Sequence, residues 1–436
     1  MQPLNFVQTV LNQQQLNGNL AFALRPGQIV SGQVTKLYPN QVAEVLIGSN
    51  KVIAQLETPL SIQERHWFQV QSGEGKVHLK VLEANEGTET VMRTENVLKA
   101  LSLPNSKENA LLLEFMQTKQ LPITKETMHT AADWLKGKPL KEGLNVIEVT
   151  LNKELPFTKS ILNSIRTIIE DEPISSIIDR LKTVLKNSDQ HEAKRLISMI
   201  DPLIKLDSKT ESDQTKNIQA TNSKIILEEL KNVIRKIGYS YENETFKLLK
   251  EQDGVEINKI ESLKPHLIRL LSEEVSAPVR EASEKLMNKI TGYQVLSQEA
   301  GPIQHLVFQV PLAVWGNGTD LTMQWSGRKN DNGKIDPNFC RILFYLSLEH
   351  IKDTIVDLHV QNRVISISVL NHREDLKEIA NLFIPNLKKA LEELNYHLSS
   401  VNFEKPSDRK ISKTDVNKKQ SNYKLPNNYS GVDFRI

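Results

Sequence analysis

The stretch "CRILFYLSLEHIKDTIVDLHVQNRVISISV", residues 340–369, decides the fold of the second half of the chain. Apolar and polar side chains alternate in three runs, and a period of two is typical of β-strands with one buried face. The runs are residues 339–348, 354–360 and 364–370. Gln361, Asn362 and Arg363 separate the last two runs, so we predict a tight turn there. The stretch therefore predicts an antiparallel sheet, and it contains no recognisable catalytic motif.

The flanking segments extend this sheet into a predicted α+β domain over residues 301–404. Upstream, "HLVFQVPLAV" and "TDLTMQW" also alternate, and Asn317-Gly318 between them is a strong hairpin signal. We expect a polar loop at "SGRKNDNGKIDPN" before the opening stretch. Downstream, apolar residues at three- and four-residue spacing predict a long helix that covers the sheet, followed by a last strand at "HLSSVNF". Pro385 removes one backbone hydrogen bond from that helix, so we expect a kink or a break near Leu382.

A second β-rich region is predicted at residues 25–84. The segments "QIVSGQVTKLY", "QVAEVLIGSNKVIAQL", "HWFQVQS" and "KVHLKVLE" indicate five short strands. Glycines at Gly48 and at residues 73–75 lie where tight turns are needed. Five short strands in about 60 residues are typical of a small closed barrel of the oligonucleotide-binding or SH3-like kind. Residues 1–24, rich in Gln and Asn, predict a short helix or a loose N-terminal segment.

Helices are predicted between the two β regions, at residues 88–205 and 224–299. Three of them share a start signal, in which Leu-Pro is followed two residues later by a Ser or Thr that can cap a helix. These capping residues are Ser106, Thr124 and Thr158. A later helix should end at Gly238, and another should run from Pro278 to Ile290 with Gly292 just beyond its end.

Two polar segments are predicted to lack a packed core. Residues 206–223 contain three apolar side chains and are predicted to be a flexible linker between the helical regions. Residues 405–436 are predicted to be a disordered, mainly basic tail. The chain as a whole is therefore predicted to be multidomain α+β.

The amino-acid composition argues against several classes of protein. The 436 residues suggest about three domains, and 55 basic against 53 acidic residues argue against a dedicated nucleic-acid binder. The single cysteine, Cys340, excludes an intrachain disulfide. The N-terminus does not read as a cleavable signal peptide, and no apolar run is long enough to span a bilayer, so we expect a soluble protein.

The sequence shows no pattern typical of catalysis. Ten histidines are scattered without metal-ligand spacing, and residues 73–75 lack the Lys and Ser/Thr of a phosphate loop. Cys340 lies in a predicted core strand, which favours a packing role over a nucleophile. We therefore expect no enzymatic activity, no metal site and no cofactor.

Nucleic-acid binding by the barrel is a hypothesis with a simpler alternative. Tyr38, Trp67 and Phe68 are able to stack on bases, but aromatic side chains in a small barrel more often form its core. The six basic residues of this region are accompanied by five acidic ones. Phosphate binding requires basic groups gathered on one face, so the balance makes nucleic acid an unlikely partner.

The C-terminal pattern resembles a known family. The matching features are alternating leucines, then alternating valines, a turn, "VISISV", and "LKEIANLFIPNLKKALEELNYHLSSVNF". In this order they resemble the C-terminal domain of flagellar hook-length control proteins, over residues 301–404. The family pattern usually has glycine where Lys352 stands. Its N-terminal part is commonly a secreted low-complexity ruler, whereas this chain has a predicted barrel and helices.

The resemblance implies a protein–protein role in flagellar type III export. Such domains contact the cytoplasmic domain of an export-gate membrane protein and switch export from hook to filament components. A cytoplasmic protein, exportable without a cleavable signal peptide, would be expected. The turn Gln361-Asn362-Arg363 is a candidate contact because arginine is favoured in interfaces, although a plain hairpin turn is the alternative. Two classes stay open: an export-linked interaction protein, and a cytoplasmic protein whose barrel binds nucleic acid or another protein.

Overall fold

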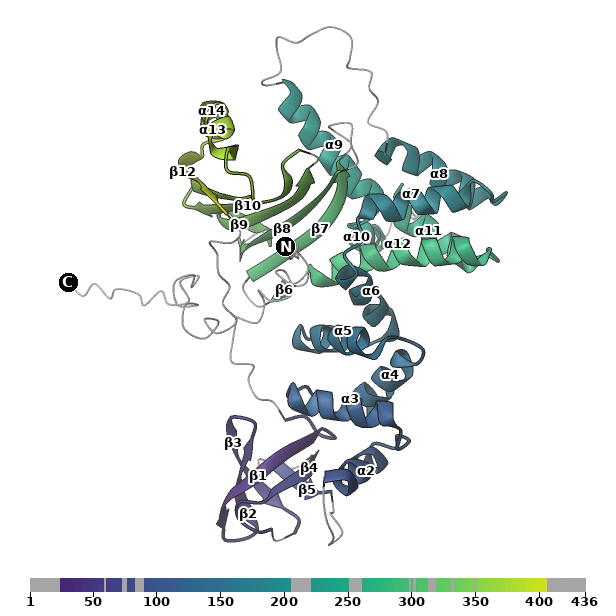
Figure 1. Cartoon of the computed structure of the whole chain (residues 1–436), viewed down its shortest axis with the longest axis vertical. Coiled ribbons are helices and arrows are strands. Elements are labelled where there is room, and N and C mark those ends of the chain that lie inside the picture. The colour runs from purple at the N-terminus through teal and green to yellow at the C-terminus, as the bar shows by residue number, and fades with distance from the viewer. Residues whose placement is uncertain are drawn as a thin grey trace, which may run out of the picture. The chain divides into compact units, whose positions relative to one another are not determined.

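The computed structural model divides the described residues into two compact units. One unit holds the barrel, the helices up to residue 298 and residues 307–320, and the other holds residues 299–306 and those from Leu321 onward. The described residues are 24–58, 60–72, 77–82, 90–204, 221–250, 261–297, 299–300, 303–312, 319–330, 333–348 and 350–405. Figure 1 shows the elements in chain order.

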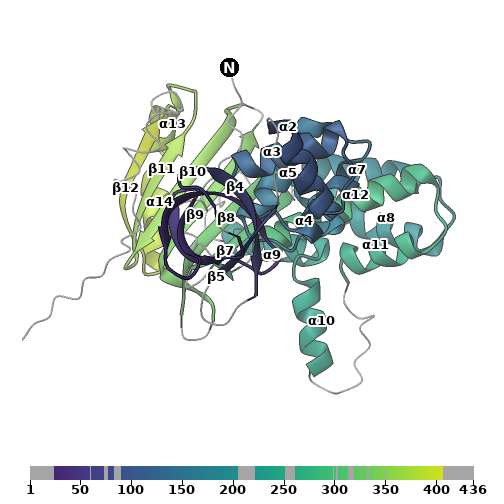
Figure 2. The ribbon, with the colours of Figure 1, turned by 90° about the horizontal axis from the view of Figure 1, so that it is seen from below.

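The predicted five-stranded barrel is confirmed. Its strands are β1 (Ile29–Tyr38), β2 (Val42–Ile47), β3 (Asn50–Leu56), β4 (Arg65–Gln71) and β5 (Val77–Val81). They close in the order β1-β2-β3-β5-β4, with β3 and β5 parallel, and Figure 2 looks into the ring they form. The core includes Val34, Val45, Phe68 and Leu79, which alternate with outward residues along their strands. Gly48 has φ +59° in the β2–β3 turn, as expected for a tight turn, whereas residues 73–75 lie outside the described residues.

Three of the helices that follow the barrel, α3, α4 and α6, begin at the predicted caps. The helices of this group are α2 (Thr90–Ala100), α3 (Lys107–Thr118), α4 (Lys125–Leu135), α5 (Leu140–Asn152), α6 (Lys159–Ile169), α7 (Ile174–Leu185) and α8 (His191–Ile204). The side chains of Ser106, Thr124 and Thr158 each accept a hydrogen bond from the backbone N–H three residues on. Each cap satisfies one of the N–H groups that a helix leaves free at its start.

The second helical group differs from the prediction at one glycine. Its members are α9 (Thr221–Ile237), α10 (Tyr241–Lys250), α11 (Leu263–Ser272) and α12 (Ala277–Leu296). Gly238 ends α9 with φ +100°, as predicted. Gly292, however, does not end a helix: it lies inside α12, where a side chain would meet Ile168 and the carbonyl of Ser164 on α6. The absence of a side chain at Gly292 lets α12 pack closely against α6. Of the predicted linker, residues 221–223 begin α9, and the remainder lies outside the described residues.

The C-terminal sheet has the predicted strands and one unpredicted pairing. It comprises β6 (Glu299–Ala300), β7 (Ile303–Leu312), β8 (Thr319–Lys329), β9 (Ile335–Leu348), β10 (Lys352–Gln361), β11 (Val364–Leu370) and β12 (His397–Glu404), in the order β12-β11-β10-β9-β8-β7-β6. The expectation of a purely antiparallel sheet is wrong for β12, which pairs parallel to β11 because the intervening helices carry the chain back to the start of β11.

The loop expected before the opening stretch is shorter than predicted. Lys329 pairs with Ile335, so both strands extend into the polar segment, and Gly333 turns the chain with φ +71°. Polar side chains lie on both faces of the strands there, so the sequence shows no apolar–polar alternation and did not predict these strand ends. The expected hairpin at Asn317-Gly318 lies outside the described residues.

The predicted long helix is two short ones. They are α13 (Leu376–Asn381) and α14 (Ile384–Glu393), which are separated at Leu382 and Phe383 as Pro385 led us to expect. Both lie at the β12 end of the sheet (Figure 1). Within residues 405–436 only Lys405 is described, and the prediction for residues 1–24 likewise lies outside the described part apart from Leu24.

Candidate partner-binding surface

Helices α13 and α14 expose a set of large apolar side chains. Leu382 is 76% exposed, Phe383 is 63% exposed and Leu394 is 65% exposed. Ile379 and Leu387 are exposed on the same two helices. We call these five residues the α13–α14 apolar surface. Single exposed apolar side chains are ordinary, but several within two short neighbouring helices and their ends make this region a candidate for contact with another molecule.

The break between the helices explains why these side chains are exposed. Ile384 and Leu391 of α14 pack on the sheet core around Val360, Ile365 and Leu398. Neither α13 nor α14 has a fully buried residue. The sequence pattern counted Ile379, Phe383, Leu387 and Leu394 among the residues that would cover the sheet. The interruption before Pro385 means that the two helices do not form one continuous stripe.

The predicted contact turn is present, and its arginine already has partners within the domain. Gln361 pairs with Val364, and Asn362 and Arg363 turn the chain with φ +49° and +63°. The side chains of all three residues are exposed. Arg363 Nε donates to Asn338 Oδ1 at 2.9 Å, and its guanidinium lies 5.7 Å from the centre of the Tyr396 ring. The turn is therefore a structured hairpin, and its role in partner contact stays a prediction.

A buried carboxylate lies on strand β10 of the same sheet. Arg341 donates two hydrogen bonds to the Asp357 carboxylate, from Nε at 2.8 Å and from Nη2 at 2.7 Å. His359 Nε2 lies 3.2 Å from Asp357 Oδ1. Burial alone raises the pKa of Asp357, but the hydrogen bonds from Arg341 and His359 outweigh burial and hold that pKa well below its usual range. The cluster is a structural ion pair across β9 and β10.

The candidate stacking residues of the barrel differ in exposure, and one of its basic residues is paired with a carboxylate. Phe68 is fully buried in the barrel core and Trp67 is half-buried, whereas Tyr38 is exposed at the end of β1. On the outer face of β2 and β3, Lys51 lies 3.2 Å from the Glu44 carboxylate. A hydrogen bond from Thr35 and the pairing with Lys51 lower the pKa of Glu44. A carboxylate therefore accompanies the basic group on this face, as the balanced composition had suggested.

No reactive constellation is evident in the described part of the chain. Cys340 is half-buried opposite Val360, and burial raises the pKa of its thiol. Among the residues that the structure describes, no group of three His, Cys, Asp or Glu side chains is placed to hold a metal ion. In the same residues, no helix is long and apolar enough to cross a membrane.

Comparison with known proteins finds similarity over part of the chain. Residues 6–80 match the TP0910 S1-like domain. The S1-like region coincides with the barrel and includes four of its strands and most of the fifth. A protein of Bacillus subtilis (strain 168), described as the uncharacterized protein YlqG, is 32% identical over 181 residues, which are 41% of this chain. This chain covers 31% of the length of that relative. No solved structure matches the chain.

Proposed function

We propose that the protein is a non-enzymatic interaction protein of the flagellar hook-length-control type. Its C-terminal domain would bind the cytoplasmic domain of a flagellar export-gate protein and take part in switching the specificity of type III export. The resemblance of residues 301–404 to that family supports the proposal. The observation that carries it is the α13–α14 apolar surface, which lies within the resembling region.

The surface suits a protein partner better than a small ligand or a nucleic acid. Three of its side chains are more than half exposed, so contact with a protein would remove apolar area from water. Charged residues flank it, including Lys388 and Lys389 on α14 and Glu378 on α13. An apolar centre with a polar rim is the usual anatomy of a protein–protein interface.

The test is calorimetric titration of the full chain with the cytoplasmic domain of the export-gate protein from the same organism. Binding at micromolar affinity or tighter, about −8 kcal/mol, is the expected result. Absence of binding with a folded chain would contradict the proposal. The turn Gln361-Asn362-Arg363 is tested in the same way: alanine at all three positions should weaken binding if the turn also contacts the partner.

A second candidate function is binding of single-stranded nucleic acid by the S1-like barrel. The match of residues 6–80 to an S1-like domain favours it, because small barrels of the oligonucleotide-binding kind present strands 2 and 3 and adjacent loops to such ligands. It ranks second because Glu44 lies on that face and only Tyr38 of the three candidate stacking residues is exposed.

Fluorescence anisotropy of a labelled single-stranded RNA with the full chain distinguishes the two candidates. A barrel that binds the backbone should lose affinity steeply as salt rises, and Tyr38→Ala should lower affinity further by removing a stacking platform. Lack of a salt-sensitive change in anisotropy would remove this candidate and leave the first unaffected.

A further inference from the structure

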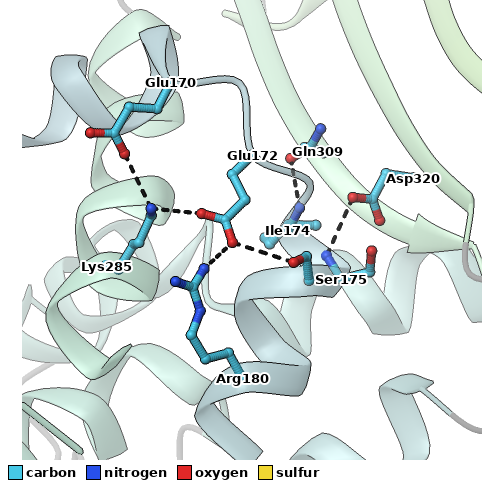
Figure 3. Close-up of polar contacts among 9 residues, drawn as sticks. Glu170, Glu172, Ile174, Ser175, Arg180, Lys285, Gln309 and Asp320 are labelled. Atoms are coloured by element: carbon cyan, nitrogen blue, oxygen red, sulfur yellow. Dashed lines mark hydrogen bonds and ion pairs between the residues drawn. The ribbon is translucent and has the colours of Figure 1, made fainter. Parts of the chain in front are cut away.

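The start of helix α7 is capped by side chains from strands β7 and β8. The residue before α7 is Pro173, which has no side-chain donor or acceptor, so the first N–H groups of the helix need other partners. Ile174 N–H donates to Gln309 Oε1 at 3.1 Å, and Ser175 N–H donates to Asp320 Oδ2 at 3.3 Å (Figure 3). Both partners come from residues more than 130 positions away. The carboxylate is also favoured by the positive end of the helix dipole.

Neutral hydrogen bonds attach β7 to the end of α12 and to the α9–α10 turn. Ser297, at the end of α12, donates through Oγ to the Val307 carbonyl at 3.0 Å and accepts from Val307 N–H at 2.9 Å. The Tyr239 hydroxyl donates to the Gln309 carbonyl at 2.7 Å. Burial raises the pKa of the Tyr239 hydroxyl, so it stays protonated across the physiological range. None of the hydroxyl and backbone groups in these hydrogen bonds gains or loses a proton between pH 5 and 9.

Beside this junction lies a buried lysine that makes no hydrogen bond. Lys289 of α12 is 0% exposed, and its Nζ has no hydrogen-bond partner. Its charged neighbours are Asp171 and Glu170 from the α6–α7 connection, Lys285 one turn earlier on α12, and Asp320 from β8. Asp320 is in a similar position, since its Oδ1 is buried without a hydrogen bond. The Tyr293 ring, whose centre lies 5.5 Å from Lys289 Nζ, faces the ammonium group, but neither charge has its full set of hydrogen bonds.

Desolvation outweighs the attraction between these two charges. Burial lowers the pKa of Lys289 to about 8, although Asp171 and Asp320 act in the opposite direction. Burial raises the pKa of Asp320 to about 6, although the hydrogen bond from Ser175 and the charge of Lys289 oppose the shift. In the folded protein each group therefore loses its charge at a pH closer to neutrality than it would in water. Between about pH 6 and pH 8 both are charged, and a buried pair of this kind is stabilising only when its hydrogen bonds are complete.

The neighbouring ion pairs at the surface are not enclosed away from water. Lys285 lies 2.6 Å from Glu172 and 3.2 Å from Glu170, and Glu172 also pairs with Arg180 (Figure 3). These side chains are partly exposed, so water solvates their charges. Lys285 therefore serves as a matched comparison for Lys289 on the same helix.

We propose that Lys289 and Asp320 form a proton-dependent release point, at which Gln309 of β7 and Asp320 of β8 separate from the start of helix α7 most readily when both groups are charged. Separation exposes both charges to water and restores their hydration, while protonation of Asp320 or deprotonation of Lys289 removes one charge and closes the junction. The release point is a pH-dependent local opening, and it does not depend on the proposed function.

Amide hydrogen exchange on the full chain tests this directly. The amides of Ile174 and Ser175 report local opening because Gln309 and Asp320 are their acceptors, and the amide of Leu181 inside α7 reports opening of the whole helix. With intrinsic rates corrected for pH, the protection of Ser175 should be lowest between pH 6 and 8 and higher at pH 5 and pH 9. The protection of Leu181 should not follow this profile.

Two variants test whether the two charges cause the profile. Lys289→Met and Asp320→Asn, made together, keep side-chain size and remove both charges. They should raise the protection of Ser175 at pH 7 by at least about tenfold, the equivalent of one pKa unit, and flatten the profile. Lys285→Met, the same change one turn away, should keep the profile. A flat profile in the unaltered chain, an unchanged profile in the double variant, or the same profile at Leu181 would overturn the proposal.

Discussion

Asp357 is a buried charge that the fold tolerates because Arg341 meets it with two hydrogen bonds. Its folded pKa lies below the value of about 3.9 for an unfolded chain. For a depressed carboxyl pKa, the stabilisation is fully present above the unfolded pKa and is lost as pH falls through the folded pKa. The contribution of the Arg341–Asp357 pair to the free energy of unfolding should therefore persist at neutral pH and disappear in strong acid.

We predict that Asp357→Asn lowers the free energy of unfolding by about 2 kcal/mol at pH 7, the usual size for a lost charged hydrogen bond. Urea denaturation measures this, and the difference from the unaltered chain should shrink at pH 3. Asp353→Asn is the matched control on the same strand, because Asp353 is exposed. An equal effect of the two substitutions would contradict the assignment of Asp357 as the structural charge.

At the residue scale, Gly292 shows a limit of sequence reasoning. Glycine near a helix end usually signals termination, and nothing in the local pattern of α12 contradicts that interpretation. The reason for this glycine lies 124 or more residues away, since an added Cβ would lie 2.6 Å from Ile168 Cγ1 and 2.8 Å from the Ser164 carbonyl oxygen. Contacts between distant segments of a chain are not readable from one sequence.

Gly292→Ala should therefore destabilise the protein despite the better helix propensity of alanine. Propensity favours the change by about 1 kcal/mol, but overpacking against α6 costs about 1–3 kcal/mol, so we expect a net loss of about 1 kcal/mol. Thermal unfolding measures it. Thr291→Ala, at the neighbouring position, should be close to neutral. A more stable Gly292→Ala variant would show that α6 and α12 are not in close contact.

At the element scale, the strands and caps were predictable because their signals are local. Alternation predicted residues 364–370 as a strand, and β11 (Val364–Leu370) has those bounds. Ser106 and Thr124 were predicted as caps from their spacing alone. The parallel pairing of β12 and the exposure of Phe383 were not predictable, because both depend on how the chain returns to the sheet after Pro385.

The buried side of helix α14 and the break between α13 and α14 should respond differently to substitution. Leu391 packs on the sheet core, so Leu391→Ala should cost about 2 kcal/mol of the free energy of unfolding. Leu382→Ser and Phe383→Ser should each change it by less than about 0.5 kcal/mol, because both side chains are mainly exposed. Urea denaturation compares the three. A large loss from either serine substitution would mean that the α13–α14 apolar surface is part of the fold's own core.

In the whole molecule, the boundary between the two compact units passes through strands β7 and β8. Residues 307–320 group with the helices, whereas the rest of β7 and β8 groups with the sheet. A boundary at residue 301, which the resemblance suggested, therefore removes the partners of Gln309 and Asp320. Sequence patterns located the sheet domain but not these hydrogen bonds to α7.

An isolated fragment of residues 301–404 should accordingly be less stable than the same sheet in the full chain. Loss of the hydrogen bonds at Gln309 and Asp320 predicts a deficit of about 1–2 kcal/mol. Hydrogen exchange at the amides of β10 and β11 measures it in both proteins. Equal protection would mean that the helices contribute nothing to the sheet.

We expect the α13–α14 apolar surface to bind the partner. The most direct measurement is calorimetric titration of the export-gate cytoplasmic domain with the full chain carrying Leu382→Ser and Phe383→Ser. Leu249→Ser, at a 63% exposed leucine on α10, is the matched control. The double variant should lose affinity by at least about tenfold, or 1.4 kcal/mol, and the control should lose none. Equal affinity for the unaltered chain and the double variant would contradict it.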